Sequence, residues 1–133
     1  MRSLIMEDFV NFKLAQKLKD KEFREECLCH YVGEDLYYNI ESPIANNQLW
    51  FSHNKFDNIW HRDNHDAPTI SQALKWLRDE KGIHVGIMLG EFSDWVYEVS
   101  RIYGNVFCEA EDNFKSYEQA ALAGIEYVLD NLI

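Results

Sequence analysis

The feature that most constrains the fold is a change in the spacing of apolar residues along the second half of the chain. The segments 83–91, 94–103 and 105–111 alternate apolar and polar residues, which is typical of strands with one buried face. The flanking segments 69–81 and 116–132 instead repeat apolar residues at helical spacing. Consecutive strands joined by short loops pair antiparallel, so this half predicts an antiparallel sheet packed against helices.

Capping sequences predict where both helices of this half begin. Thr69-Ile70-Ser71-Gln72 and Ser116-Tyr117-Glu118-Gln119 each place a glutamine at the third position after a hydroxyl side chain that can cap a helix. Gly82 predicts the end of the first helix. In the last helix, the small residues Ala123 and Gly124 predict a close approach to the sheet.

A short loop predicts the register of the last two strands. With Tyr103-Gly104 as a two-residue hairpin loop, Val99 pairs with Cys108, and both lie on the core face. The same register places Glu98 opposite Glu109 on the other face of the sheet.

The first half of the chain predicts one helix and one hairpin. Residues 8–20 carry apolar residues near helical spacing. Residues 27–32 and 35–40 are rich in aromatic and β-branched residues and flank Gly33-Glu34, which suits two strands joined by a tight turn. We therefore expect a single α+β domain over residues 1–133, with an antiparallel sheet of about five strands packed against two to three helices.

Composition and charge narrow the classes of partner. The chain has 133 residues, of which 47% are hydrophobic, enough for one core without disulfides or metal. Its formal net charge of −10 disfavours nucleic acid and anionic membranes as partners. Ordinary acidic solubility accounts for this charge, and so would a basic protein partner or carboxylates that mimic the phosphates of DNA. The N-terminal apolar run is too short for a signal peptide, and the sequence holds no membrane-spanning segment, so we expect a cytoplasmic protein.

The three cysteines, Cys27, Cys29 and Cys108, are too few and too oddly spaced for a disulfide framework. Cys27 and Cys29 form C-x-C, which is neither the redox motif nor a zinc knuckle, and a zinc site that adds His30 matches no common ligand spacing. Residues two apart share one face of a strand, so both thiols suit burial as small apolar groups. We expect all three cysteines to be reduced and to bind no metal.

Residues 42–68 lack sustained periodicity and are too many for an ordinary loop in a compact domain. They concentrate asparagines, histidines and the large aromatic residues Trp50, Phe51 and Trp60. Large aromatic residues dominate binding energy at interfaces, and loops on a rigid scaffold often bind partners. The same residues could instead fold back over a sheet, because exposed apolar patches are rare in monomers. Our hypothesis is that Trp50 and Trp60 contribute more to association than to stability.

This segment also holds the cluster of residues that most resembles metal ligands. His61 and His65, with Asp63 or Asp66, could supply imidazole and carboxylate to zinc or a similar ion. Two histidines at this spacing meet most readily on a helix, whereas Pro68 and the polar composition favour a loop. No H-E-x-x-H motif is present, so a solvated histidine-rich loop is the other interpretation.

Three stretches of the sequence resemble a known group of proteins. They are Ala15-Gln16-Lys17-Leu18-Lys19, the run from Ala67-Pro68-Thr69 to Leu77-Arg78, and the ending from Ser116-Tyr117-Glu118 to Leu132-Ile133. The chain resembles small proteins encoded on bacterial chromosomes, prophages and other mobile elements, over most of its length but only loosely across 42–66. That group has no assigned activity, so the resemblance implies an accessory role of phage or mobile-element type and transfers no catalytic residue.

These observations favour a small accessory protein that binds a protein partner or a second copy of itself, without catalytic residues or a cofactor. A metal-dependent hydrolase or nuclease that uses His61 and His65 is the alternative from another class. An acidic inhibitor that mimics DNA is a further alternative.

Overall fold

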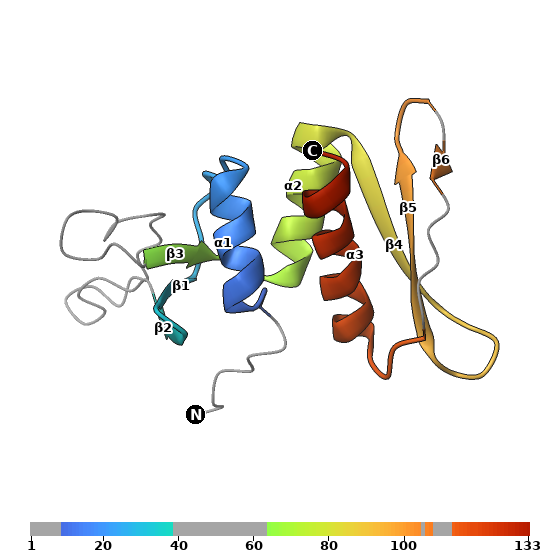
Figure 1. Cartoon of the computed structure of the whole chain (residues 1–133), viewed down its shortest axis with the longest axis horizontal. Helices are drawn as coiled ribbons and strands as arrows, with labels where there is room; N and C mark the ends of the chain where they lie inside the picture. The colour runs from blue at the N-terminus through green and yellow to red at the C-terminus, as the bar shows by residue number, and fades with distance from the viewer. Residues whose placement is uncertain (1–8, 39–63, 105, 108–112) are drawn as a thin grey trace, which may run out of the picture. The chain divides into compact units, whose positions relative to one another are not determined.

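The structure, a computed structural model, describes residues 9–38, 64–104, 106–107 and 113–133. These residues form helices and antiparallel strands, which confirms the predicted α+β class. In chain order the elements are α1 (Phe12–Asp20), β1 (Cys29–Val32), β2 (Asp35–Tyr38), β3 (Asn64–Ala67), α2 (Ile70–Lys81), β4 (Ile83–Leu89), β5 (Trp95–Arg101), β6 (Val106–Phe107) and α3 (Tyr117–Asn131) (Figure 1).

The described strands lie in two sheets, with the strand orders β2-β1-β3 and β4-β5-β6. The chain divides into two compact units, residues 1–69 and 70–133, and each contains one of these sheets. We describe the units separately, and the single domain over residues 1–133 stays a prediction. None of the helices in the described part of the chain has the length and apolar character that crossing a membrane requires.

In the first unit, α1 packs against β3, and the β1–β2 hairpin continues the sheet. Asn11 caps α1, because its side-chain oxygen accepts a hydrogen bond from Leu14 N at 2.9 Å. The hairpin turns at Gly33, as predicted, and the φ of Gly33 is 59°, in the left-handed region that a tight turn requires. The buried side of α1 and the buried residues of β1 form the core of this unit.

The sequence predicts an irregular segment over 42–68, and for residues 64–67 this prediction is wrong. These residues form β3, which pairs antiparallel with β1 and places His65 opposite Tyr31. Polar residues have low strand propensity, but pairing with a neighbouring strand outweighs that propensity. Residues 39–63 lie outside the described part of the chain.

Long-range hydrogen bonds fix the residues that precede α1. Val10 N donates to Pro68 O at 3.0 Å, and Phe9 pairs with Thr69 in an isolated bridge. The hydroxyl of Tyr31 donates to Val10 O at 2.8 Å in a buried position. These contacts join residues that are distant in the sequence, so no local pattern predicts them.

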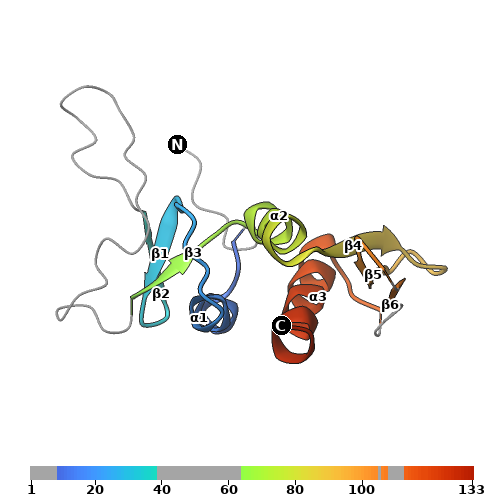
Figure 2. The ribbon, with the colours of Figure 1, turned by 90° about the horizontal axis from the view of Figure 1, so that it is seen from above.

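In the second unit, α2 and α3 lie on the same face of the sheet (Figures 1 and 2). α2 begins at Ile70, directly after Thr69, and ends before Gly82, whose φ is 66°. Ser116 caps α3, because its hydroxyl oxygen accepts a hydrogen bond from Gln119 N at 3.1 Å. Both predicted helix starts are therefore confirmed.

The predicted register of β5 and β6 is wrong by one residue. Val99 pairs with Phe107 and Ser100 pairs with Val106, whereas the sequence predicts Cys108 opposite Val99. The connecting loop is therefore one residue longer than a two-residue hairpin loop, and Gly104 within it has a φ of 120°. A shift of one residue exchanges the two faces of a strand. The residue opposite the buried Val99 is therefore Phe107, and the predicted partner Cys108 is not.

The predicted close approach of the last helix to the sheet is confirmed at Gly124. A Cβ atom on Gly124 would lie 2.6 Å from Val85 Cγ1 and 3.1 Å from Tyr97 Cγ. Val85 on β4 and Tyr97 on β5 are buried, so the backbone of α3 rests directly on the core face of the sheet here. Ala123, one position earlier, is only partly buried.

Candidate functional site

Most of the predicted binding and metal-ligating residues lie outside the described part of the chain. Trp50, Phe51 and Trp60 are among them, and so are His61 and Asp63. Their roles in association or in metal binding therefore stay predictions.

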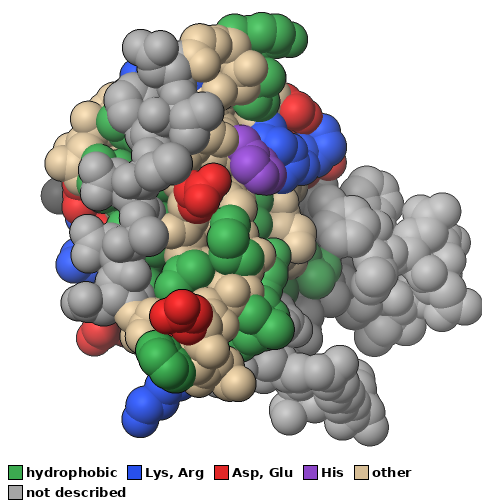
Figure 3. Space-filling view, turned by 90° about the vertical axis from the view of Figure 1, so that its right-hand side faces the viewer, with side chains coloured by type: hydrophobic (Ala, Val, Ile, Leu, Met, Phe, Trp, Pro, Cys, Tyr) green, Lys and Arg blue, Asp and Glu red, His purple; other side chains and the backbone are tan. Residues whose placement is uncertain are grey.

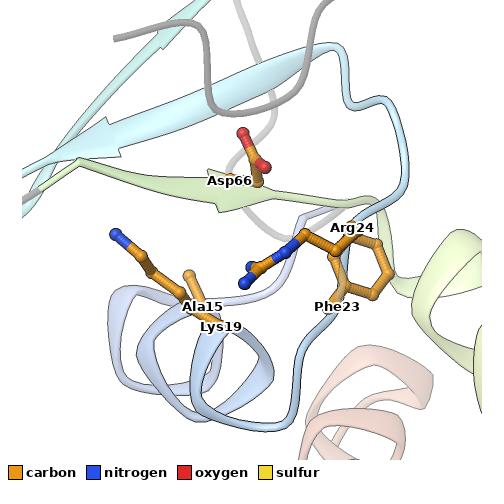
Figure 4. A pocket seen from close by; sticks show the side chains of 5 residues that line it. All are labelled: Ala15, Lys19, Phe23, Arg24 and Asp66. Carbon is orange, nitrogen blue, oxygen red and sulfur yellow. The ribbon is translucent and has the colours of Figure 1, made fainter. Parts of the chain in front are cut away.

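The two remaining predicted metal ligands, His65 and Asp66, lie side by side on β3 but face opposite sides of it, because successive side chains of a strand alternate. The ring of His65 contacts that of Phe12 on α1, with centroids 5.5 Å apart. The carboxylate of Asp66 extends to the other side of β3 from Ala15 and Lys19 of α1 (Figure 4). The two side chains therefore do not converge on one ion. In the described ranges of the chain, no three His, Cys, Asp or Glu side chains cluster so that they could hold a metal.

Asp66 instead pairs across the sheet with a residue that the sequence analysis did not select. It lies directly opposite His30 on β1, and both are buried, with exposures of 8% and 5%. Tyr37 of β2 stacks on His30 with ring centroids 5.9 Å apart. An imidazole beside a carboxylate can exchange a proton, but burial of both groups keeps a substrate from reaching them. We interpret this pair as part of the sheet's packing. Without β3 in the predicted fold, no sequence signal could place His30 beside Asp66.

A small depression on the α1 side of β3 is lined by Ala15, Lys19, Phe23, Arg24 and Asp66 (Figure 4). Lys19 and Arg24 give it a basic character, because the carboxylate of Asp66 points away from them. The space between these side chains is too narrow for a bound molecule. It therefore offers no ligand site.

Cys27 and Cys29 are buried thiols, and neither forms a disulfide within the described part of the chain, whereas Cys108 lies outside the described residues. Burial raises the pKa of the Cys29 thiol to about 11. Burial, with a smaller contribution from the nearby carboxylate of Asp66, raises the pKa of Cys27 well above its ordinary range. Neither thiol is therefore a nucleophile at neutral pH.

We expect these two thiols to react slowly with a disulfide reagent in the folded protein. At pH 8, a pKa of about 11 leaves Cys29 with roughly one thiolate in a thousand, against about a quarter for an unperturbed thiol. Titration with Ellman's reagent before and after denaturation measures this, and the denatured chain should show all three cysteines as free thiols. Rapid labelling of Cys27 or Cys29 in the native state, located by mass spectrometry, would contradict the buried assignment.

Large apolar side chains are exposed at two loops of the second unit. Met88, Leu89 and Phe92 lie where β4 turns into β5, with exposures of 41%, 62% and 78%. Ile102 and Tyr103 lie at the other end of β5 and are also exposed. Figure 3 shows hydrophobic side chains, in green, exposed beside acidic ones, in red, on the described surface that faces the viewer. Met88 and Leu89 are successive residues of β4 and face opposite sides of the sheet, and Phe92 lies in the turn that follows. We call these three residues, at one end of the hairpin, the hairpin-end surface.

A closed turn holds the hairpin-end surface in place. Gly90 N donates to Asp94 O at 2.6 Å, and Ser93 adopts a φ of 64°, which is uncommon for a residue with a side chain. The same turn carries the acidic residues Glu91 and Asp94. The sequence predicts a strand here and no binding role, because Ile83 and Leu89 belong to the same apolar alternation although only Ile83 is buried.

No protein-family model, curated protein or solved structure matches this chain.

Proposed function

We propose that the chain is a protein-interaction module without catalytic activity, an accessory protein of phage or mobile-element type that binds its protein partner through the hairpin-end surface. The accessory role is supported by the resemblance of three stretches of the sequence to small proteins encoded on bacterial chromosomes, prophages and other mobile elements. The interaction role rests on one observation, the grouping of Met88, Leu89 and Phe92 in exposed positions at one end of a hairpin. Exposed apolar residues scattered singly are ordinary, whereas neighbouring ones mark interaction sites.

The composition of the surface supports a protein partner over other ligands. Phenylalanine and methionine are enriched in the centres of protein interfaces, and charged residues lie at their rims. Here the exposed side chains include Phe92 and Met88, and the turn also carries Glu91 and Asp94. The alternative of a metal-dependent hydrolase or nuclease that uses His61 and His65 stays a prediction, because His61 lies outside the described residues. Of its two possible carboxylate ligands, Asp66 faces the opposite side of β3 from His65. The alternative of a DNA mimic rests on net charge alone.

The proposal predicts that polar substitutions at the hairpin end abolish association without changing stability. The double variant Leu89→Ser/Phe92→Ser should unfold within about 0.5 kcal/mol of the wild type, because both side chains are exposed. Its association should be lost in two measurements: light scattering of the purified protein and cross-linking in the native host followed by mass spectrometry.

Tyr103→Ser is the matched control, because Tyr103 is 89% exposed at the other loop of the sheet and should associate like the wild type. A double variant that keeps every cross-link of the wild type would overturn the proposal. So would a wild-type protein that stays monomeric and captures no cross-linked partner.

A further inference from the structure

The sheet of the second unit has one face that its helices cover, and this face continues beyond them at the end near Leu89. Val85 of β4 marks the covered part, because it is buried and lies against Gly124 of α3. Leu89 is four residues further along β4, so its side chain points to the same side of the sheet, and it is 62% exposed. Part of an apolar sheet face is therefore open to solvent.

Two aromatic residues extend this open part across the sheet. Leu89 lies directly opposite Trp95 of β5, and Trp95 lies directly opposite Phe114. Residues that lie directly opposite each other point to the same side of a sheet, so the three side chains form a row. The backbones of Trp95 and Phe114 exchange two hydrogen bonds of 2.8 Å, which fix one end of the row. We call Leu89, Trp95 and Phe114 the apolar row.

The ring of Tyr117, the first residue of α3, lies against the apolar row. Its centroid is 5.6 Å from that of Trp95 in an edge-to-face arrangement, and Tyr117 is 39% exposed. Trp95 and Phe114 are partly exposed. A ligand can therefore reach each member of the row, and neighbouring exposed apolar residues mark interaction sites.

The length of the apolar row matches one side of an α-helix. The backbone of Trp95 bonds to Phe114, so Leu89 and Trp95 are a pair without hydrogen bonds. The Cα atoms are about 4.5 Å apart in such a pair and about 5.5 Å apart in a hydrogen-bonded pair, so the row is about 10 Å long. A helix rises about 10.5 Å over seven residues, so its side chains at positions i, i+3 or i+4, and i+7 meet the row at matching intervals. Side chains on one side of a strand repeat about every 6.8 Å, which fits the row less well.

The charges beside the apolar row favour a basic ligand. Residues 89–95 and 113–118 carry the acidic side chains Glu91, Asp94 and Glu118 and a single basic one, Lys115. Glu91 is exposed in the turn that follows β4. The whole chain has a net charge of −10, so it attracts a basic segment and repels a second copy of itself.

We propose that the apolar row binds an amphipathic helix of a basic partner protein. The apolar side of that helix would lie along the row, on the same face of the sheet as α2 and α3, and its lysine or arginine side chains would lie near Glu91. This inference rests on the proposed function, because Leu89 belongs to both surfaces. It adds the chemistry of the partner, which is a helix with one apolar side and a positive charge.

The test uses three capped peptides of about 14 residues, or about four helical turns. The first combines leucine at helical spacing with lysine elsewhere, the second replaces each lysine with glutamate, and the third has the composition of the first but alternates leucine and lysine as in a strand. Each is titrated into the full chain labelled with nitrogen-15 and followed by two-dimensional NMR. The first should give saturable shifts centred on residues 89–95 and 113–118, and added salt should weaken its binding. The other two should bind at least about tenfold more weakly.

Variants assign the binding to the apolar row. Leu89→Ser/Tyr117→Ser removes exposed apolar area and should weaken binding of the first peptide by at least about tenfold. Tyr103→Ser is the matched control, because it makes the same change as Tyr117→Ser at the other end of β5, and it should leave binding unchanged. Circular dichroism checks that each variant is folded.

Equal binding of the alternating peptide would assign the row to a strand, and equal binding of the glutamate peptide would remove the role of charge, so either result overturns the inference. So would unchanged binding in the double variant, an absence of saturable shifts, or a wild-type dimer that the double variant dissociates. Cross-links in the native host that depend on Leu89 and Phe92, without binding of the first peptide, would refute this inference and leave the hairpin-end surface as an interaction site.

Discussion

Replacing Gly124 with leucine should lower the free energy of unfolding by about 1–3 kcal/mol, because it overpacks the contact between α3 and the sheet. A Cβ atom at this position would lie 2.6 Å from Val85 Cγ1, closer than carbon atoms can approach without displacement. Val85 and Tyr97 are both buried, so neither can move aside without disturbing the core. Leucine favours the helix over glycine by nearly 1 kcal/mol, and this gain offsets part of the strain. The measured loss of unfolding free energy is therefore smaller than the strain itself. Urea denaturation followed by circular dichroism measures the effect.

The adjacent residue provides the control for this prediction. Ala123→Leu adds an equally bulky side chain to the same helix, but Ala123 is only partly buried and faces an open groove beside α3. We expect it to change the free energy of unfolding by less than about 0.5 kcal/mol. Gly124→Ala should fall between the two, because it adds only the Cβ atom. A wild-type stability for Gly124→Leu, or an equal loss for Ala123→Leu, would show that the close contact lies elsewhere on α3.

The second unit was largely predictable because its signals are local. Helix caps at Thr69 and Ser116, the stop at Gly82 and the alternation in 83–89 each depend on residues within a few positions of one another. The close approach of α3 was also predictable, because a glycine within a buried helix face has few other uses. The register of β6 was not predictable, because it depends on the length of the loop around Gly104, which the sequence alone leaves ambiguous.

The first unit was less predictable because its structure depends on contacts between distant residues. β3 consists of polar residues, so its strand character comes from pairing with β1 and not from propensity. Once β3 is in place, His30 meets Asp66 and Val10 meets Pro68, and neither pair leaves a local pattern in the sequence.

The candidate sites were missed for a related reason. Leu89 continues the apolar alternation that begins at Ile83, and only the position of the covering helices separates it from the buried Ile83. Met88 lies on the opposite face of the strand. The aromatic residues Tyr97, Phe114 and Tyr127 likewise come together from three separate stretches of the sequence. In both cases the sequence shows the residue types, but it does not show which side chains are exposed or which lie close together in the fold. The binding residues predicted from the sequence fall in the segment 42–68, most of which lies outside the described residues.

Replacing Tyr31 with phenylalanine should lower the free energy of unfolding by about 1–3 kcal/mol at neutral pH. The hydroxyl of Tyr31 donates to Val10 O at 2.8 Å, and both residues are buried. Phenylalanine keeps the ring but leaves the carbonyl of Val10 without this donor. Tyr37→Phe is the matched control on the neighbouring strand, because Tyr37 is 50% exposed, and it should change stability by less than about 0.5 kcal/mol. Equal losses in the two variants would contradict a specific role for the Tyr31 hydrogen bond.

The same pair of variants predicts a dependence on pH whose sign follows from the pKa of Tyr31. Burial, with a smaller contribution from the nearby Cys29, raises the pKa of Tyr31 above its ordinary value of about 10. Above that value the unfolded chain loses the phenolic proton more readily than the folded protein does, so rising pH favours unfolding. Tyr31→Phe has no proton to lose at this position. The stability advantage of the wild type over Tyr31→Phe should therefore be constant below about pH 9 and shrink as the pH rises past 10. Urea titrations of both proteins from pH 7 to the highest pH at which each still folds measure this difference. An advantage that stays constant or grows over that range would contradict the raised pKa of Tyr31.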